Sequence, residues 1–251
     1  MRFFVVCAAL LLSALSTHAT AQTYTGDKTV YTSVDPAASG AYQPPPVAST
    51  NTQSDWVKFD PIVAPWNCTG KCAVTLFAGP LLRTGEGQVL GVDGYVPPWR
   101  YRFGDSAFVG GTLSQVLVEF GDYADLEGEI GVGQRFGFLH ETEGWVALYG
   151  RWKWFPWNNY ITTTVAVSTG LDYASGIPPY EVQLSSVGHG SNLLHYFSPE
   201  ITFAKPDRPD WQLVIRLHHR SGGGQYWGYT PIFKGVGGGA QYLVFGIRHW
   251  F

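Results

Sequence analysis

The sequence predicts an all-β fold: an eight-stranded antiparallel transmembrane β-barrel with an N-terminal extended arm. Glycine, Trp and Tyr are frequent and Met occurs once in 251 residues, a composition that favours strands and tight turns over helices. Eight segments of strand character follow residue 72, separated by turn signals. Short and long connections alternate between them, as in outer-membrane barrels with short periplasmic turns and longer extracellular loops.

The first 21 residues read as a secretory signal peptide. Arg2 supplies the positive charge, residues 3–15 are apolar, and Ala19-Thr20-Ala21 fits a signal cleavage site. The apolar stretch is too short to span a bilayer as a helix. We therefore expect an exported protein whose mature chain begins near residue 22.

Residues 22–72 are rich in Pro, Ser and Thr and show no sustained periodicity. This composition predicts an extended or disordered arm on the periplasmic side. Cys68 and Cys72 are close in sequence, and export makes a small-loop disulfide between them plausible. The alternative, a metal site, would need further ligands nearby, and the adjacent sequence has none.

Residues 73–251 form the predicted barrel. Its strands are expected at 73–83, 105–120, 124–137, 144–154, 159–172, 192–204, 211–221 and 240–251. The short connections are expected at 121–123, 155–158 and 205–210, and the others at 84–104, 138–143, 173–191 and 222–239.

The last predicted strand, 240–251, ends on an aromatic residue, as the closing strands of outer-membrane barrels often do. Tryptophans gather near the ends of the predicted strands, where an aromatic girdle meets the lipid headgroups. The tryptophans assigned to this girdle are Trp145, Trp152, Trp154, Trp157, Trp211 and Trp250.

Several predicted strands place charges of both signs on one face and apolar residues on the other. A soluble β-sandwich would keep its interior apolar, whereas a narrow membrane barrel is filled by side chains whose charges must be paired. The residues assigned to an internal ion-pair network are Glu119, Glu127, Glu129, Glu200, Arg135, Arg151, Lys153, Arg216 and Arg248.

His219 and Ser221 are the pair that can carry chemistry. Two residues apart on a strand, they share one face, and that face continues the apolar row of Leu213, Ile215 and Leu217. On the predicted topology both lie at the extracellular end and point toward lipid. They offer a hydroxyl nucleophile beside an imidazole base.

The segments 217–224 and 246–251, with the eight strands and the signal peptide, resemble the lipid A 3-O-deacylase family of outer-membrane barrels, also called acyloxyacyl hydrolases. The resemblance implies an esterase that removes an acyl chain from lipid A, with lipopolysaccharide in the outer leaflet of the bacterial outer membrane as its partner. It implies His219 as general base and Ser221 as nucleophile of a His-Ser-Glu triad. It implies no metal or organic cofactor.

The sequence departs from the family pattern at two positions. The family's Glu lies about a dozen residues after the Ser, but Phe233 stands there and no Asp or Glu follows Asp210. Gln241 is the nearest polar candidate, because an amide can orient a His tautomer without stabilising its charge. Gly222 stands where the family often has Asn, and the run 222–224 can aim an N–H at an oxyanion or simply begin a flexible loop.

Two alternatives stay open. The chain can be a non-catalytic structural or adhesion barrel, or another lipid A modifying enzyme, an oxidase or an acyltransferase, with Asp105-Ser106 as the pair that would serve acyl transfer.

A net charge of −3 gives no case for nucleic acid. The histidines His140, His189 and His195 have no metal-ligand spacing. The arginines assigned to the outer rim, as contacts for phosphate or as interfacial anchors, are Arg83, Arg100, Arg102 and Arg220.

Overall fold

The computed structural model describes residues 56–185, 187–223 and 231–251, so the predicted signal peptide and most of the predicted arm lie outside it. The strands are β1 (Val57–Phe59), β2 (Cys72–Leu82), β3 (Phe103–Phe120), β4 (Ala124–Gly137), β5 (Thr142–Trp152), β6 (Thr162–Ala174), β7 (Leu193–Phe197), β8 (Glu200–Lys205), β9 (Arg208–Ser221) and β10 (Gly239–Trp250). The helices are η1 (Pro65–Asn67), α2 (Glu86–Leu90), η2 (Pro98–Arg100), α3 (Pro179–Leu184) and η4 (Pro231–Phe233). Among these described helices, none has the length and apolar character needed to cross a membrane.

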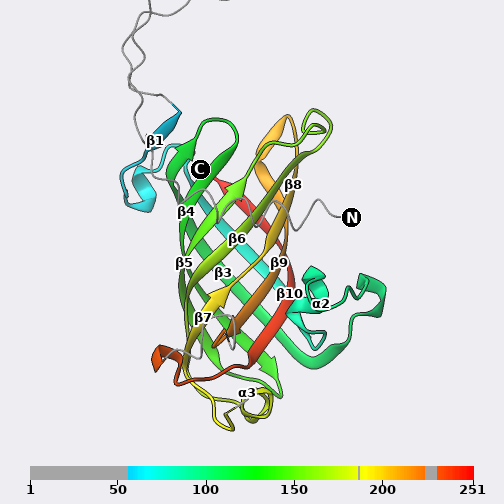
Figure 1. The fold of residues 1–251 in the computed structure, drawn as a ribbon. Helices are drawn as coiled ribbons and strands as arrows, with labels where there is room; N and C mark the ends of the chain where they lie inside the picture. Colours follow the sequence, from blue (N-terminus) through cyan, green and yellow to red (C-terminus); the bar gives the residue numbers. More distant parts are fainter. Residues whose placement is uncertain (1–55, 186, 224–230) are drawn as a thin grey trace, which may run out of the picture. The chain divides into compact units, whose positions relative to one another are not determined.

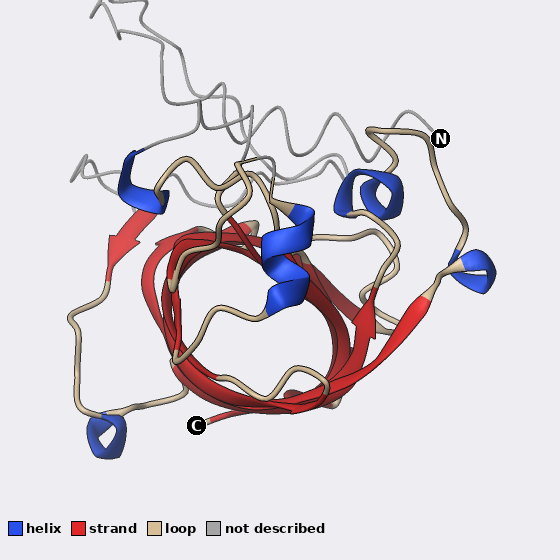
Figure 2. Cartoon of the chain, turned by 90° about the horizontal axis from the view of Figure 1, so that it is seen from below, coloured by secondary structure: helices blue, strands red, loops and turns tan. Residues whose placement is uncertain are grey.

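The strands close into an antiparallel ring with eight positions (Figures 1 and 2). Around the ring, β3, β2, β10 and β9 are followed by β7 and β8 together and then by β6, β5 and β4. The pairing of β4 with β3 completes the circle. The predicted antiparallel arrangement and its eight positions are confirmed.

One position of the ring is interrupted, so the ring is not a regular barrel. The sequence predicts a single strand over 192–204, but Ser198 and Pro199 separate β7 from β8. Proline has no N–H to donate to a neighbouring strand. Its carbonyl still accepts a hydrogen bond of 2.9 Å from the N–H of Leu217, which keeps this position joined to β9.

The connections depart from strict alternation in length. At one end the segment 153–161 between β5 and β6 is longer than the segment 138–141 between β4 and β5 at the other end. The remaining long connections, 83–102, 175–192 and 222–238, meet at the same end of the ring and contain the helices α2, α3 and η4.

The described part of the predicted arm, 56–71, is ordered against the ring. β1 pairs with the end of β3, where Val57 lies opposite Phe120. Cys68 and Cys72 are joined by a disulfide. Lys71 holds this segment in place because its Nζ donates to Asp60 at 2.5 Å and to Glu119 at 2.8 Å.

The two faces of the strands differ as the sequence predicts. Apolar side chains on the outer rows remain exposed, for example Leu76 at 65%, Ile130 at 56% and Leu213 at 62%. Charged side chains on the inner rows are buried, including Arg216 and Arg248 at 0%. The alternation of the strands therefore places large apolar groups outside the ring and ionisable groups inside it.

One buried network inside the ring has equal numbers of positive and negative groups. Its Glu200 contacts three guanidinium groups, at 2.8 Å from Arg151, 2.8 Å from Arg216 and 2.8 Å from Arg248. Its other pairs include the two parallel hydrogen bonds, 2.9 and 2.8 Å long, from Arg216 to Glu129. We call it the balanced network; its members are Glu127, Glu129, Glu200, Arg151, Arg216 and Arg248.

Three predicted members of the internal network lie apart from the balanced network, and one of them, Arg135, belongs to a second buried network with Glu143 and Glu181. The other two lie near one end of the ring. Glu119 bonds to Lys71 near the end of the ring, and its side chain is 30% exposed. Lys153 bonds to Asp125 at 2.7 Å. Both residues are therefore in local pairs at the end of the ring with the short turns.

An aromatic layer, which the sequence analysis did not predict, lies beyond the balanced network. Trp145 was assigned to an interfacial girdle, but it is 3% exposed and packs inside the ring. Gly131 and Gly133 make room for the layer, because a Cβ at either position would collide with the ring of Trp145 or of Phe108. The members of the layer are Phe77, Phe108, Trp145, Tyr149, Tyr196, Tyr242 and the imidazole of His218.

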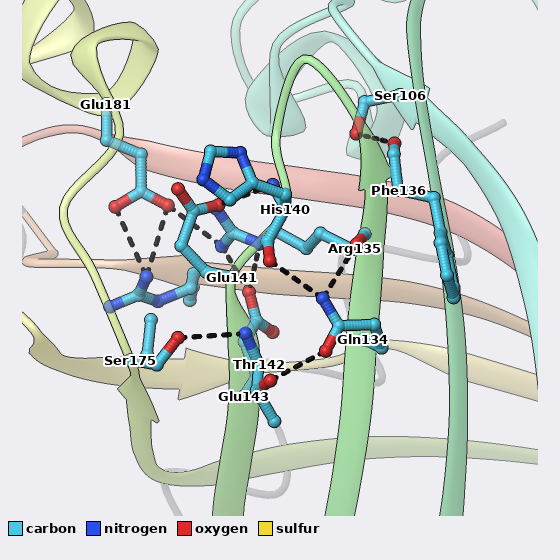
Figure 3. A network of polar contacts seen from close by, with 12 residues as sticks. Ser106, Gln134, Arg135, Phe136, His140, Glu141, Thr142, Glu143, Ser175 and Glu181 are labelled. Atoms are coloured by element: carbon cyan, nitrogen blue, oxygen red, sulfur yellow. Dashed lines mark hydrogen bonds and ion pairs between the residues drawn. The ribbon is translucent and has the colours of Figure 1, made fainter.

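A second buried network lies on the far side of the aromatic layer, at the end with the long connections (Figure 3). Arg135 contacts Glu143 and lies 2.9 Å from Glu181, which comes from α3. Arg220 lies 2.9 Å from Asp172 and 3.1 Å from Glu181. We call it the acidic network; its members are Glu141, Glu143, Asp172, Glu181, Arg135 and Arg220, with His218 bonded to Glu143 at 2.7 Å.

This network corrects one prediction and explains the position of α3. Arg220, assigned to the outer rim, is completely buried and points into the ring. Glu181 is 1% exposed although it belongs to a connecting segment. Because its carboxylate binds both arginines of the network, α3 is held across the opening of the ring (Figure 2).

Candidate active site

His219 and Ser221 lie together on the outer row of β9. Nε2 of His219 is 3.0 Å from Oγ of Ser221, within reach for transfer of a proton. The backbone N–H of Gly223 donates to the same Oγ at 3.2 Å. The structure thus brings together the two residues that the sequence singles out.

Gln241 fixes the orientation of the His219 ring. It stands opposite His219 on β10, and its Oε1 is 3.0 Å from Nδ1. Its amide nitrogen donates to the carbonyl oxygen of Thr84. Since a carbonyl can only accept, Oε1 must face His219 and Nδ1 must carry a hydrogen. A neutral His219 then presents the lone pair of Nε2, which is the tautomer of a general base for Ser221.

A carboxylate also reaches this site. Glu86, the first residue of α2, places its Oε2 2.9 Å from Nε2 of His219. The side chains of His219 and Glu86 are 12% and 28% exposed. Burial acts to raise the pKa of Glu86, but the hydrogen bond and the charge of His219 outweigh it and lower that pKa below its ordinary value. Nε2 therefore has two neighbours, a hydroxyl and a carboxylate.

Glu86 is not among the predicted site residues, because the family pattern places the acid about a dozen residues after Ser221. Phe233, which stands at that spacing, lies in η4 and is 7% exposed. Glu86 comes instead from the connection 83–102, beside β10 in Figure 1. Its only sequence signal was that this connection was predicted at the same end of the ring as His219 and Ser221.

A cleft of about 690 Å³ opens at these residues. Arg83 is the one Lys or Arg among the described residues of its wall, and Ser221 and His219 line it from β9. Much of the remaining wall is apolar. The apolar side chains that line it are Leu82, Leu90, Val92, Leu184 and Phe197. The cleft is thus suited to a ligand with both a hydrocarbon part and a polar part.

His195 is a second imidazole in this cleft. It lies on β7 directly opposite Ser221, and its Nε2 is 2.9 Å from Oγ1 of Thr169. The sequence does not mark His195 as a site residue, because its spacing to the other histidines is not that of metal ligands. Only the pairing of β7 with β9 places it next to Ser221.

The other candidates are not gathered at the site. Asp105 is exposed whereas Ser106 is buried and bonds inside the ring to Tyr242 and to the carbonyl of Phe136 (Figure 3). The two residues therefore point to opposite faces and cannot act as a pair.

One group of described residues has the geometry of metal ligands. Glu143, Asp172 and His218 each offer one ligand atom, and these atoms lie within 4.8 Å of one another. All three are buried in the acidic network, where Arg135 and Arg220 already bind the carboxylates. We therefore describe the group as part of that network.

Comparison with known proteins gives no relative: no family model and no curated protein matches the chain.

Proposed function

We propose that the ring is a β-barrel that spans the outer membrane of a Gram-negative bacterium. The outer rows of its strands are apolar and exposed, and a soluble monomer rarely exposes so much contiguous apolar surface. Residues of this surface on seven different strands are Leu76, Val109, Ile130, Val132, Val146, Leu148, Leu171, Leu213, Phe245 and Ile247. The long connections would then lie outside the cell, as in barrels of this class.

The activity we propose is hydrolysis of an ester-linked acyl chain of lipid A. The observation that carries it is the 3.0 Å contact between Nε2 of His219 and Oγ of Ser221, with Nδ1 held by Gln241, on an outer row of the ring. A lipid ester in the outer leaflet would meet this row directly. The resemblance to lipid A 3-O-deacylases, stated from the sequence, points to the same reaction.

The proposed reaction has two steps. Oγ of Ser221 attacks the ester carbonyl carbon while its proton passes to Nε2 of His219. The ester C–O bond then breaks, and the leaving alkoxide takes that proton. Water next attacks the acyl-serine, loses a proton to Nε2 and releases the fatty acid, after which Ser221 recovers the proton. The N–H of Gly223 is placed beside Oγ and can donate to the oxyanion.

The cleft fits this class of substrate. Its apolar wall suits an acyl chain, and Arg83 is available to a phosphate group on the sugar. Arg100 and Arg102 are exposed in the same connection and can extend that contact.

The second candidate is a non-catalytic structural or adhesion barrel. One observation favours it: Nδ1 of His219 faces an amide rather than a carboxylate, so an imidazolium would not be stabilised from that side. A lipid A oxidase or acyltransferase is a third candidate, but the Asp105-Ser106 pair that would serve acyl transfer is split between the two faces.

Mass spectrometry of lipid A tests the proposal. The wild type, Ser221→Ala and Ser114→Ala are expressed in a strain with unmodified lipid A. Ser114 is a matched control, because its hydroxyl is buried inside the ring without a hydrogen-bond partner. We expect loss of one acyl mass with the wild type and Ser114→Ala but not with Ser221→Ala. Identical spectra for all three would favour the structural barrel, and a gain of oxygen would favour an oxidase.

A further inference from the structure

We propose that Glu86 is a built-in inhibitor of the site: its carboxylate holds Nε2 of His219 protonated, and the site becomes active when the connection 83–102 withdraws it. The inference rests on the proposed function in one respect only, that His219 is the base for Ser221. The contact itself is a property of the folded chain, since Oε2 of Glu86 lies 2.9 Å from Nε2.

The other ring nitrogen of His219, Nδ1, is held in one protonation state. Nδ1 faces the acceptor Oε1 of Gln241 at 3.0 Å, and that amide cannot turn without losing its bond to the carbonyl of Thr84. Nδ1 therefore carries a hydrogen in every state of the site. The only proton that His219 can gain or lose is the one on Nε2.

Ser221 and Glu86 both contact Nε2 of His219, and the two contacts require opposite protonation states of that nitrogen. Ser221 can give up its proton only to a bare Nε2. Ionised Glu86 can form its hydrogen bond only with a protonated Nε2, because two acceptors facing each other repel. The two short distances, 3.0 Å to Ser221 and 2.9 Å to Glu86, thus belong to a site in which imidazolium is held by Glu86 and cannot act as a base.

The position of Glu86 suits a contact that can be released. It lies on a helix of only five residues that ends at Gly91 with φ 80. The side chain is 28% exposed and forms part of the cleft wall. A ligand that fills the cleft beside Ser221 would compete with Glu86 for the same space. Binding of an acyl ester would then displace the inhibitor, and an empty site would stay inactive.

Other titratable groups line the same cleft as His219 and must be kept in the test. They are Arg83, which lines the cleft, Asp93 from the same connection, His195 on β7 and Tyr180 on α3. Only Glu86 among them has an ion pair of less than 4 Å with His219 in the described residues. Removing the carboxylate of Glu86 should therefore change the surroundings of Nε2 more than removing any of these other groups.

The test compares wild type, Glu86→Gln, Glu86→Ala and Asp105→Asn as full-length protein in detergent micelles. Asp105 is an exposed carboxylate at the same end of the ring and controls for the loss of one surface charge. The first readout is the titration of His219 by NMR. The second is kcat/KM against pH for hydrolysis of a short-chain p-nitrophenyl ester.

We expect Nε2 of His219 to lose its proton at a lower pH in both Glu86 variants than in the wild type, because the carboxylate 2.9 Å away is gone. The acid limb of kcat/KM should move by the same amount, with an increase of at least several-fold at a pH just below the wild-type midpoint. Asp105→Asn should change neither. An unchanged midpoint, or a loss of activity in the Glu86 variants, would overturn the proposal.

The NMR readout separates this inference from the esterase proposal. If no protein hydrolyses the ester but the midpoint falls in the Glu86 variants, the contact does hold Nε2 of His219 protonated and the esterase proposal fails alone. If the wild type is active and the midpoint does not move, the esterase proposal stands and the inhibitor is rejected.

Discussion

The balanced network and the acidic network occupy the same ring but differ in how their charges match. In the balanced network three carboxylates face three guanidinium groups. In the acidic network four carboxylates, those of Glu141, Glu143, Asp172 and Glu181, face only Arg135 and Arg220. Two negative charges are left over there when His218 is neutral.

The two networks differ in charge balance because their residues come from different kinds of element. All six groups of the balanced network stand on strands, so their spacing is set by the register of the ring. The acidic network includes Glu181 from α3 and lies at the end with the long connections. Buried charges without partners are costly, so we expect protons on this network to offset its surplus. The two networks should therefore respond differently to loss of a carboxylate.

The largest effect is expected from Glu200→Gln. This carboxylate serves Arg151, Arg216 and Arg248 at once, and its loss leaves positive charge buried without a partner. We expect the free energy of unfolding to fall by about 3 to 5 kcal/mol. The measurement is urea unfolding in lipid vesicles followed by Trp fluorescence. A loss below about 1 kcal/mol would mean that the balanced network does not depend on matched charges.

Glu181→Gln should have a smaller effect, confined to one end of the ring. The change weakens the contacts of α3 with Arg135 and Arg220, at 2.9 and 3.1 Å, but it also removes one surplus charge. We expect faster hydrogen exchange over Pro179–Leu184 and a change of about 1 kcal/mol in unfolding. Exchange that stays as slow as in the wild type would show that α3 is held by its other contacts.

Asp172→Asn is the direct counterpart of Glu200→Gln and should be nearly neutral. Asp172 is completely buried, and its Oδ2 has no hydrogen-bond partner among the described residues. Removing its charge lowers the surplus, so we expect a change within about 1 kcal/mol in unfolding at neutral pH. A loss as large as that of Glu200→Gln would remove the distinction between the two networks.

The contact between Glu86 and His219 should give the smallest effect, because it lies outside the ring and is partly exposed. The pKa of Glu86 is lowered on folding, with burial opposing and the hydrogen bond and charge of His219 prevailing. Its stabilisation is therefore present above the ordinary value of 4.5 and lost as the pH falls through the lower value of the folded protein. We expect Glu86→Gln to remove less than about 1 kcal/mol at pH 6 and nothing at pH 2. A larger loss in acid than at pH 6 would contradict this sign.

The sequence determined the eight strand positions, the antiparallel order and the side of each strand that carries charge, because a period of two along a strand is a local property. It also singled out His219 and Ser221, whose shared face follows from their spacing alone. The arginines and carboxylates of the balanced network were all predicted for the same reason.

The tertiary structure decided which side chains from different strands and connections contact one another. The period of two already puts Trp145 on the inner row of β5 with Tyr149 and Arg151, but only the pairing of strands shows that Gly131 and Gly133, on the neighbouring strand, leave space for an aromatic layer. The period of two already puts Arg220 on the inner row of β9 with Arg216, but its partner Glu181 comes from a distant connection that crosses the opening of the ring. Glu86 reaches His219 only because the connection 83–102 folds back beside β10. Each of these contacts joins residues from different elements. The residue pattern of a single strand cannot predict which residues of other elements will lie next to it.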